Sequence, residues 1–268
     1  MRRLLKWFGD TLADLLYPPR CLACNKALDH KEYRHDYNGR HAIMFCRACR
    51  QKIAAPRKKI CLYCGGSLFT QGERPERCIS CEQTTFPFRR VIALGPYCEP
   101  LRSLLLQAKH RTGGEIPWSL ARLTTLLRRD DFANLEIDLV VPVPMHFLRR
   151  LLRGINSPEV MAAWYAKSLG VPCRSNLLQR HRATRRQSSL PGPKRRTNVA
   201  GAFALRPRSR FLRRPLDIAG KRILLVDDIF TTGATCTEIA KLLLSAGAKE
   251  ITVVTIARAE GKDIPRSG

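Results

Sequence analysis

The sequence contains no long apolar stretch. Nowhere among its 268 residues is there a run of about 18 or more apolar side chains, the minimum that a membrane-spanning helix needs. The first 17 residues resemble a secretory signal only weakly, because three charged side chains interrupt the apolar run and no small-residue cleavage site follows. We therefore predict no transmembrane segment and a cytoplasmic location, and we interpret residues 1–18 as an amphipathic helix.

Acidic side chains are scarce. The chain has 22 Asp and Glu against 48 Lys and Arg, so its formal net charge is +26 at pH 7. An excess of this size predicts polyanionic partners, and single-stranded DNA is the one that we expect. Residues 180–198 are almost all basic or polar, but no aromatic side chains are interleaved with them, so they do not form a platform on which bases stack. A generally basic, solvated surface is the alternative interpretation of the charge.

Cysteine, by contrast, is abundant and clustered. Eight of the 11 cysteines lie between positions 21 and 81 as four pairs, each with two residues between its members. One such Cys-x-x-Cys knuckle supplies two thiolates from a tight turn, and a tetrahedral zinc site takes four thiolates at about 2.3 Å from the metal. The pairs therefore predict two structural zinc sites. Their ligands would be Cys21, Cys24, Cys46, Cys49, Cys61, Cys64, Cys78 and Cys81.

Two other interpretations of the cysteine pairs are disfavoured. A disulfide framework fits poorly because nothing in the sequence marks secretion, and redox chemistry would not need four such pairs. Sequential pairing would give two zinc ribbons in tandem, and a cross-braced arrangement is the alternative. The remaining cysteines, Cys98, Cys173 and Cys236, are isolated, and we interpret them as buried or incidental.

The segment Ile223–Thr235 carries the clearest sign of chemistry. Its first four residues, 223–226, are apolar and predict a buried strand of a parallel sheet. Asp227 and Asp228 follow at the carboxyl end of that strand, where open α/β sheets bind ligands. The loop 231–235 then offers hydroxyls, backbone N–H groups and the N-terminus of the next helix, which together suit a phosphate. Two carboxylates beside a phosphate cradle indicate a sugar phosphate as the ligand.

Other segments complete a predicted α/β domain. Residues 86–95 and 137–144 predict strands, and residues 157–169 predict a helix. The basic loop at 144–154 lies between a strand and a helix, where a pyrophosphate would fit, although a solvated charge run is the alternative. Residues 180–214 predict either a lid that closes over a phosphorylated ligand or a patch that follows a nucleic-acid backbone.

Taken together, these motifs resemble the ComF/GntX family. Ile223–Thr235 is similar to the signature with which type I phosphoribosyltransferases bind phosphoribosyl pyrophosphate, PRPP. The segments Val141–Pro144, Arg153–Asn156, 182–190 and 195–203 also resemble motifs of the family. So does the order of parts, in which four cysteine knuckles precede the transferase domain. The family is associated with competence for DNA uptake and the use of external DNA in bacteria.

The resemblance runs from about Leu15 to Arg258 and implies a fold. We expect an α/β protein with a type I phosphoribosyltransferase-like parallel sheet flanked by helices, preceded by a small N-terminal double zinc ribbon. The boundaries implied are 1–18 for the amphipathic helix, 19–85 for the double zinc ribbon and 86–268 for the phosphoribosyltransferase-like domain.

The resemblance also implies roles for individual residues. Asp227 and Asp228 would hold the ribose hydroxyls, directly or around Mg²⁺, and would be the catalytic acids of any reaction. The residues that would bind the phosphate and pyrophosphate are Thr231, Thr232, Gly233, Ala234, Thr235, Arg149 and Arg153. The flexible loop would include Thr184, Gln187, Arg195 and Asn198. Purine-salvage relatives carry an Asp at the position of Thr231, so 6-oxopurine salvage is not expected here.

Three functions are compatible with these features. The first is a Mg²⁺-dependent phosphoribosyltransferase with an unknown acceptor, although no residue that would activate the incoming nucleophile can be named. The second is a binding module that senses PRPP or a nucleotide while the zinc ribbons and basic patches hold single-stranded DNA or a protein partner. The third is a non-catalytic adaptor in a DNA-uptake or recombination assembly, with a vestigial PRPP site.

Overall fold

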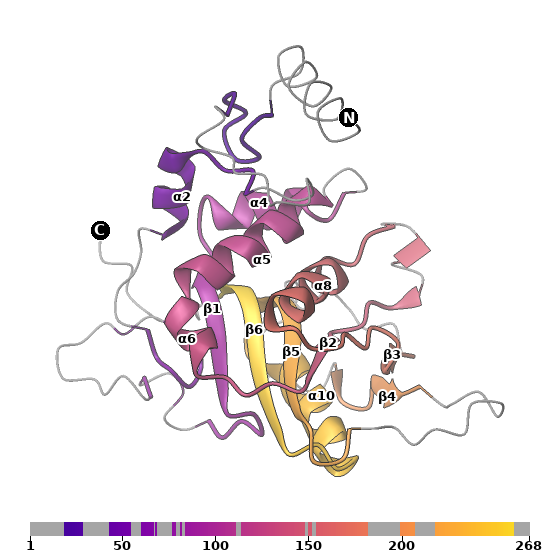
Figure 1. Cartoon of the computed structure of the whole chain (residues 1–268). Coiled ribbons are helices and arrows are strands. Elements are labelled where there is room, and N and C mark those ends of the chain that lie inside the picture. Colours follow the sequence, from indigo (N-terminus) through magenta and orange to yellow (C-terminus); the bar gives the residue numbers. More distant parts are fainter. Residues whose placement is uncertain are drawn as a thin grey trace, which may run out of the picture.

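The structure, a computed structural model, describes most of the chain (Figure 1). The described residues are 19–28, 43–54, 60–66, 68, 77–78, 81, 84–110, 114–147, 150–151, 154–181, 199–206 and 218–259. The amphipathic helix predicted at 1–18 lies outside them. Within these ranges, no helix combines the length and the apolar character that crossing a bilayer takes.

A four-stranded parallel sheet with the strand order β1-β6-β5-β2 forms the centre of the molecule. Its strands are β1 (Arg90–Pro96), β2 (Leu139–Pro142), β5 (Arg222–Phe230) and β6 (Glu250–Arg258). All three neighbouring pairs run parallel. The apolar run at 223–226 and the mostly apolar run at 251–257 are buried at every position. Strands that are apolar throughout, rather than at alternate positions, are those that a parallel sheet buries between two layers of helices.

Helices cover both faces of this sheet. The helices are α2 (Arg47–Ala54), α4 (Leu101–Gln107), α5 (Glu115–Leu127), α6 (Arg129–Ala133), α8 (Ser157–Leu169) and α10 (Ala234–Ser245). Successive strand residues point to opposite faces, so Leu224 and Val226 join the core beneath α4, α5 and α8. Ile223 and Leu225 join the core beneath α10. Figure 1 shows α5 and α8 in front of the sheet and α10 behind it.

Helix α8 has the bounds that the sequence predicts. Pro158 lies in its first turn, where a missing N–H costs nothing, and Gly170 ends it with a left-handed φ of 68°. The helix packs on α5, where the indole N–H of Trp164 donates to the hydroxyl of Thr125 at 2.9 Å. The helix that follows the predicted loop at 144–154 is therefore fixed against the rest of its layer.

A second, antiparallel sheet pairs β3 (Leu178–Arg180) with β4 (Phe203–Leu205). This pair was not predicted from the sequence, because strands of three residues carry too few positions for a recognisable period. It pairs the beginning of the basic segment predicted at 180–214 with residues that lie inside that segment. The described residues next to the strands continue the contact, since the N–H of His181 donates to Ala202 at 3.2 Å.

The cysteine-rich segment packs directly on the sheet. Phe45 belongs to the same buried cluster as Leu94 of β1. The N–H of Met44 lies 3.4 Å from the hydroxyl of Ser119 in α5, to which it donates. The first part of the segment therefore shares a core with the α/β fold, whereas the four cysteines of the second part pack in a small cluster of their own.

Three strands differ in their bounds from the prediction, and the one expected at 137–144 spans only Leu139–Pro142. The strand expected at 86–95 starts only at Arg90, and the Phe86 and Phe88 rings before it stack on each other and meet Phe230. Strand β5 runs on to Phe230, since β6 pairs with it that far. The two carboxylates therefore lie within the last part of the strand, not after it.

Candidate functional site

Asp227 and Asp228 lie where the carboxyl edge of the sheet is uneven. Strand β2 ends at Pro142, which pairs with Val226 of β5, and the N–H of Val143 donates to the Val226 carbonyl at 2.8 Å. Among the described strands, β5 pairs with β6 alone from Asp227 onward. The side of β5 that faces β2 is therefore open beside the two acids, which is where ligands bind in open α/β sheets.

The carboxylate of Asp227 is buried, with 9% of the residue exposed. Its Oδ1 accepts the backbone N–H of Asp228 at 2.9 Å, and the Sγ of Cys236 in α10 lies 3.8 Å from its Oδ2. Burial, and then the charge of Asp228, raise the pKa of Asp227 well above its usual value. Burial and the charge of Asp227 also raise the pKa of Cys236, so this thiol stays protonated and can donate.

The loop after β5 turns at Gly233, which has a φ of 76° and precedes helix α10. A left-handed backbone of this kind favours glycine. A Cβ here would lie 2.6 Å from the Phe230 ring and 2.9 Å from the Phe86 ring, so close packing also excludes a side chain. The turn places residues 231–233 at the N-terminus of α10, whose first N–H groups have no partners within the helix and attract anions.

The Thr232 hydroxyl is buried in this loop. Within the described part of the chain it has no hydrogen-bond partner. A buried hydroxyl without a hydrogen-bond partner costs about 1–3 kcal/mol, so a ligand that bonds to it would recover this free energy. A phosphate oxygen is such a partner. The donors of the loop therefore fit the phosphate that the sequence predicts.

The two acids fit magnesium. Mg²⁺ prefers hard oxygen ligands, usually one or two carboxylates together with phosphate oxygens of a substrate. Asp227 and Asp228 supply such carboxylates, and burial, followed by repulsion from Asp228, raises the pKa of Asp227. A divalent cation would relieve this repulsion and favour the ionised pair.

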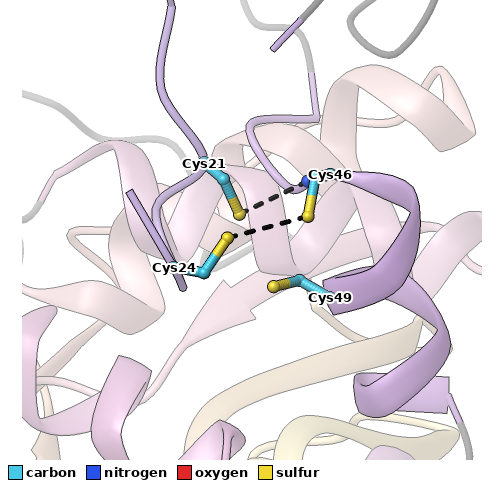
Figure 2. A group of neighbouring side chains, drawn as sticks. All are labelled: Cys21, Cys24, Cys46 and Cys49. Atoms are coloured by element: carbon cyan, nitrogen blue, oxygen red, sulfur yellow. Dashed lines mark hydrogen bonds between the residues drawn. The ribbon is translucent and has the colours of Figure 1, made fainter. Parts of the chain in front are cut away.

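Cys21, Cys24, Cys46 and Cys49 point toward one another, as Figure 2 shows. Their sulfur atoms all lie within 4.8 Å of one another, and the sulfurs of Cys24 and Cys46 are 3.8 Å apart. Four thiolates at about 2.3 Å from a tetrahedral zinc would be separated by roughly 3.8 Å. Burial raises the pKa of Cys21, but backbone N–H groups, first that of Cys46 at 3.3 Å, bring it down to about 7 and favour the thiolate.

Cys61, Cys64, Cys78 and Cys81 form the second group. The sulfur pairs Cys61–Cys81 and Cys64–Cys78 are each 3.5 Å apart, far longer than the bond of about 2.05 Å in a disulfide. The eight cysteines are thus grouped sequentially and not cross-braced. Both groups fit zinc, and a closed four-thiolate site leaves no position for a substrate, so the metals would be structural.

Two family models match the chain, one in its N-terminal part and one in its C-terminal part. Residues 12–82 match a double zinc ribbon domain and residues 156–267 match a phosphoribosyl transferase domain. Competence protein F of Haemophilus influenzae is 30% identical over 217 residues, which are 80% of this chain and 90% of that protein. The chain belongs to the ComF/GntX family. DNA utilization protein YhgH of Escherichia coli is 31% identical over 216 residues, which are 80% of this chain and 89% of that protein.

More distant matches concern part of this ComF/GntX chain. Amidophosphoribosyltransferase 3 of Arabidopsis thaliana, chloroplastic, is 33% identical over 119 residues, which are 44% of the chain and 19% of that protein. The solved structure of an allosteric regulatory enzyme of purine biosynthesis has a TM-score of 0.34 at 23% identity. This match covers 52% of this chain and 26% of the enzyme chain. Likenesses of this extent carry no argument about substrate.

The predicted fold class, a parallel sheet with flanking helices after a double zinc ribbon, is confirmed.

Several predicted ligand-binding residues lie outside the described part of the chain, and their roles stay predictions. They are Arg149, Arg153, Thr184, Gln187, Arg195 and Asn198. The described residues around the predicted pyrophosphate loop are well connected. The guanidinium of Arg150 donates to both carboxylate oxygens of Glu159 in α8 at 2.9 Å, and the Asn156 amide donates to the Val143 carbonyl at 3.3 Å. The start of α8 is thus tied to the end of β2.

Three residues next to the site were not predicted to matter there. Cys236 was interpreted as buried or incidental, and it is buried, but it lies against the Asp227 carboxylate. Phe86 lies beneath the Gly233 turn. Arg258, at the end of β6, donates to the Thr231 carbonyl at 2.6 Å. The sequence signal for Arg258 is a charge at the end of a strand whose interior is mostly apolar.

Proposed function

We propose that this protein binds PRPP together with Mg²⁺ at Asp227–Thr235 and serves DNA uptake or the use of external DNA. The observation that carries the ligand is a pair of carboxylates, of which Asp227 is buried, followed by a loop with a buried, unsatisfied Thr232 hydroxyl at a helix N-terminus. The carboxylates would hold the ribose hydroxyls and the ion, and the loop would hold the 5′-phosphate. The names of the relatives, which refer to competence and DNA utilization, support the biological role.

If bound PRPP is turned over, the reaction displaces pyrophosphate from C1 of the ribosyl group through an oxocarbenium-like state. Mg²⁺ supplies charge that stabilises the departing pyrophosphate. Asp227 and Asp228 would hold the ribose, and the N–H groups of loop 231–235 would hold its phosphate, so that the ring stays oriented while the bond at C1 breaks. We assign no residue to activation of the acceptor, and binding and turnover are therefore tested separately.

Isothermal titration calorimetry with PRPP, with and without Mg²⁺, tests the proposal. We expect saturable binding by the wild type with Mg²⁺ and loss of that binding in the double variant Asp227→Asn/Asp228→Asn. Asp130→Asn, which neutralises an exposed acid of α6, is the control and should bind as the wild type does. A pyrophosphate-release assay with a panel of bases and amines then measures turnover. A wild type that shows no PRPP-dependent heat would overturn the proposal.

The net charge of +26 favours a second candidate, a DNA- or protein-binding adaptor with a vestigial PRPP site. Binding to the phosphates of single-stranded DNA should weaken steeply with salt, because each contact releases a counterion. The double variant at Asp227 and Asp228 should keep its DNA affinity if DNA and PRPP occupy separate sites. Loss of DNA and PRPP binding together would contradict the separation of the two sites.

A further inference from the structure

Arg258 connects the second group of cysteines to the loop of the proposed PRPP site. It is the last residue of β6 and pairs in register with Phe230 of β5. Its guanidinium lies 5.1 Å from the centroid of the Phe230 ring. Nε donates to the carbonyl of Cys64 at 3.1 Å, and Nη1 donates to the carbonyl of Thr231 at 2.6 Å. One side chain therefore bridges a predicted zinc ligand and the first residue of the loop.

The bond to Thr231 sets the direction of the next backbone donor. A peptide unit is planar and trans, so the carbonyl of Thr231 and the N–H of Thr232 point in opposite directions. Because Arg258 binds this carbonyl, the N–H of Thr232 points away from Arg258. An anion at a helix N-terminus binds to N–H groups whose direction is fixed. The positive charge of the guanidinium strengthens the hydrogen bond to the Thr231 carbonyl, and this bond fixes the direction of the Thr232 N–H.

Aromatic side chains make a second connection between the same two places. The hydroxyl of Tyr63, which lies in the first knuckle of the second group, accepts the N–H of Phe86 at 2.6 Å. The Phe86 ring meets the Phe230 ring edge-on at 5.8 Å between centroids. Both rings lie against Gly233, where a Cβ would come within 2.6 to 2.9 Å of them. The knuckle and the Gly233 turn therefore rest on one aromatic layer.

The position of this knuckle depends on the cysteines themselves. The buried cluster of the second group contains its four cysteines and Leu68, with Tyr63 and Phe86 packed at its side. A module with so small a core is normally ordered by its metal, and the free energy of metal binding then becomes free energy of folding. Zinc would therefore fix the Cys64 carbonyl that Arg258 contacts, together with the bond from the Val91 N–H to the Tyr63 carbonyl at 3.2 Å.

We propose that zinc at Cys61, Cys64, Cys78 and Cys81 holds the loop 231–233 in its phosphate-binding shape through Arg258 and Phe86. PRPP affinity then depends on occupancy of a metal site that takes no part in the chemistry, and Arg258 is a positioning residue. The identity of the ligand rests on the proposed function, whereas the link between the zinc site and the loop does not.

Arg258→Met tests the link. Methionine retains an unbranched side chain over Phe230 but donates no hydrogen bond. We expect PRPP affinity to fall about tenfold, the loss of one charge-assisted hydrogen bond. Amide hydrogen exchange at 231–233 should become faster while the zinc content stays unchanged. The matched control is Arg89→Met, which removes the same charge at the opposite end of β6, where Arg89 pairs with Glu250 at 3.3 Å. It should match the wild type in all three measurements.

Cys78→Ser tests the metal directly, with Cys98→Ser as the control because Cys98 is exposed and belongs to neither group. Exchange at 231–233 should be faster in Cys78→Ser than in Cys98→Ser. If Cys78→Ser fails to fold, Arg258→Met still tests whether the second cysteine group is connected to the loop 231–233. Wild-type exchange and wild-type PRPP affinity in Arg258→Met would overturn the inference. If the wild type binds no PRPP but exchange responds as expected, the proposed function fails and the link between zinc and loop stands.

Discussion

Asp227 is a carboxylate that the fold buries next to another negative charge. Its environment raises its pKa, first through burial and then through Asp228. Such a residue lowers the stability of the ligand-free protein at neutral pH, and it is retained where a ligand or cation uses the charge. The Cys236 thiol is one of its few described partners, and at 3.8 Å it is a weak one.

We expect Asp227→Asn to raise the melting temperature while abolishing PRPP binding. The folded-state pKa of Asp227 lies above the unfolded value of about 3.9, so its contribution to stability falls as pH rises from about 4 toward the raised pKa. Asparagine has no charge to bury. The difference in melting temperature should be small at pH 4 and largest at pH 8, as circular dichroism would measure. A variant that melts below the wild type at pH 8 would contradict this.

Gly233→Ala should destabilise the protein more than Gly170→Ala does. Both glycines have positive φ angles, 76° and 68°, so both variants pay about 1–2 kcal/mol for a left-handed backbone. At Gly170 a Cβ would meet no described atom within 4 Å, whereas at Gly233 it would meet Phe230 at 2.6 Å. Overpacking of this kind costs about 1–3 kcal/mol more. Urea denaturation measures the free energy of unfolding of the two variants. Equal decreases in the two would show that the Phe86 and Phe230 rings move aside to accommodate the methyl group.

At the scale of elements, the site depends on the register between β2 and β5. Asp138 precedes β2, and its carboxylate accepts the Arg222 guanidinium at 2.9 and 3.0 Å and the Arg222 N–H at 2.9 Å. This contact aligns the beginnings of the two strands. The alignment carries through to Pro142 and Val226, so Asp227 is the first residue of β5 beyond the end of β2.

Asp138→Asn should lower the melting temperature at neutral pH. The guanidinium of Arg222 is the main cause that holds the pKa of Asp138 well below its usual range. A depressed folded-state pKa contributes stability above the unfolded value of about 3.9, and this contribution is lost as pH falls below it. The difference between wild type and variant should therefore be full at pH 7 and shrink below pH 4. Differential scanning calorimetry measures it, and a difference that is independent of pH would exclude this ion pair as its source.

At the scale of the whole molecule, the cysteine-rich segment and the sheet are one body. Phe45 and Ile53 share a buried cluster with Leu94 and Leu101, and Val91 of β1 donates to the Tyr63 carbonyl at 3.2 Å. The boundary expected at 85/86 separates two sequence patterns, but the core continues across it. The zinc sites therefore support the sheet as well as their own knuckles.

Removal of zinc should consequently lower the stability of the entire described fold. We expect a single calorimetric transition in the zinc-loaded protein and a lower melting temperature of the sheet after treatment with a strong chelator. Elemental analysis before and after treatment reports the metal content. Two separate transitions, with the upper one unaffected by the chelator, would show that the two parts unfold independently.

The sequence by itself determined the local parts of this protein. Apolar runs fixed the buried strands, paired cysteines fixed the knuckles, and the acids with the Thr-Thr-Gly loop fixed the place of the site, because each pattern reflects the chemistry of a few adjacent residues. Only the tertiary structure decided which knuckles lie together and how far β5 extends. It also placed Arg258 between Thr231 and Cys64, although Arg258 and Cys64 are 194 positions apart in the sequence. Contacts over such separations depend on how the layers pack, which no local period or spacing encodes.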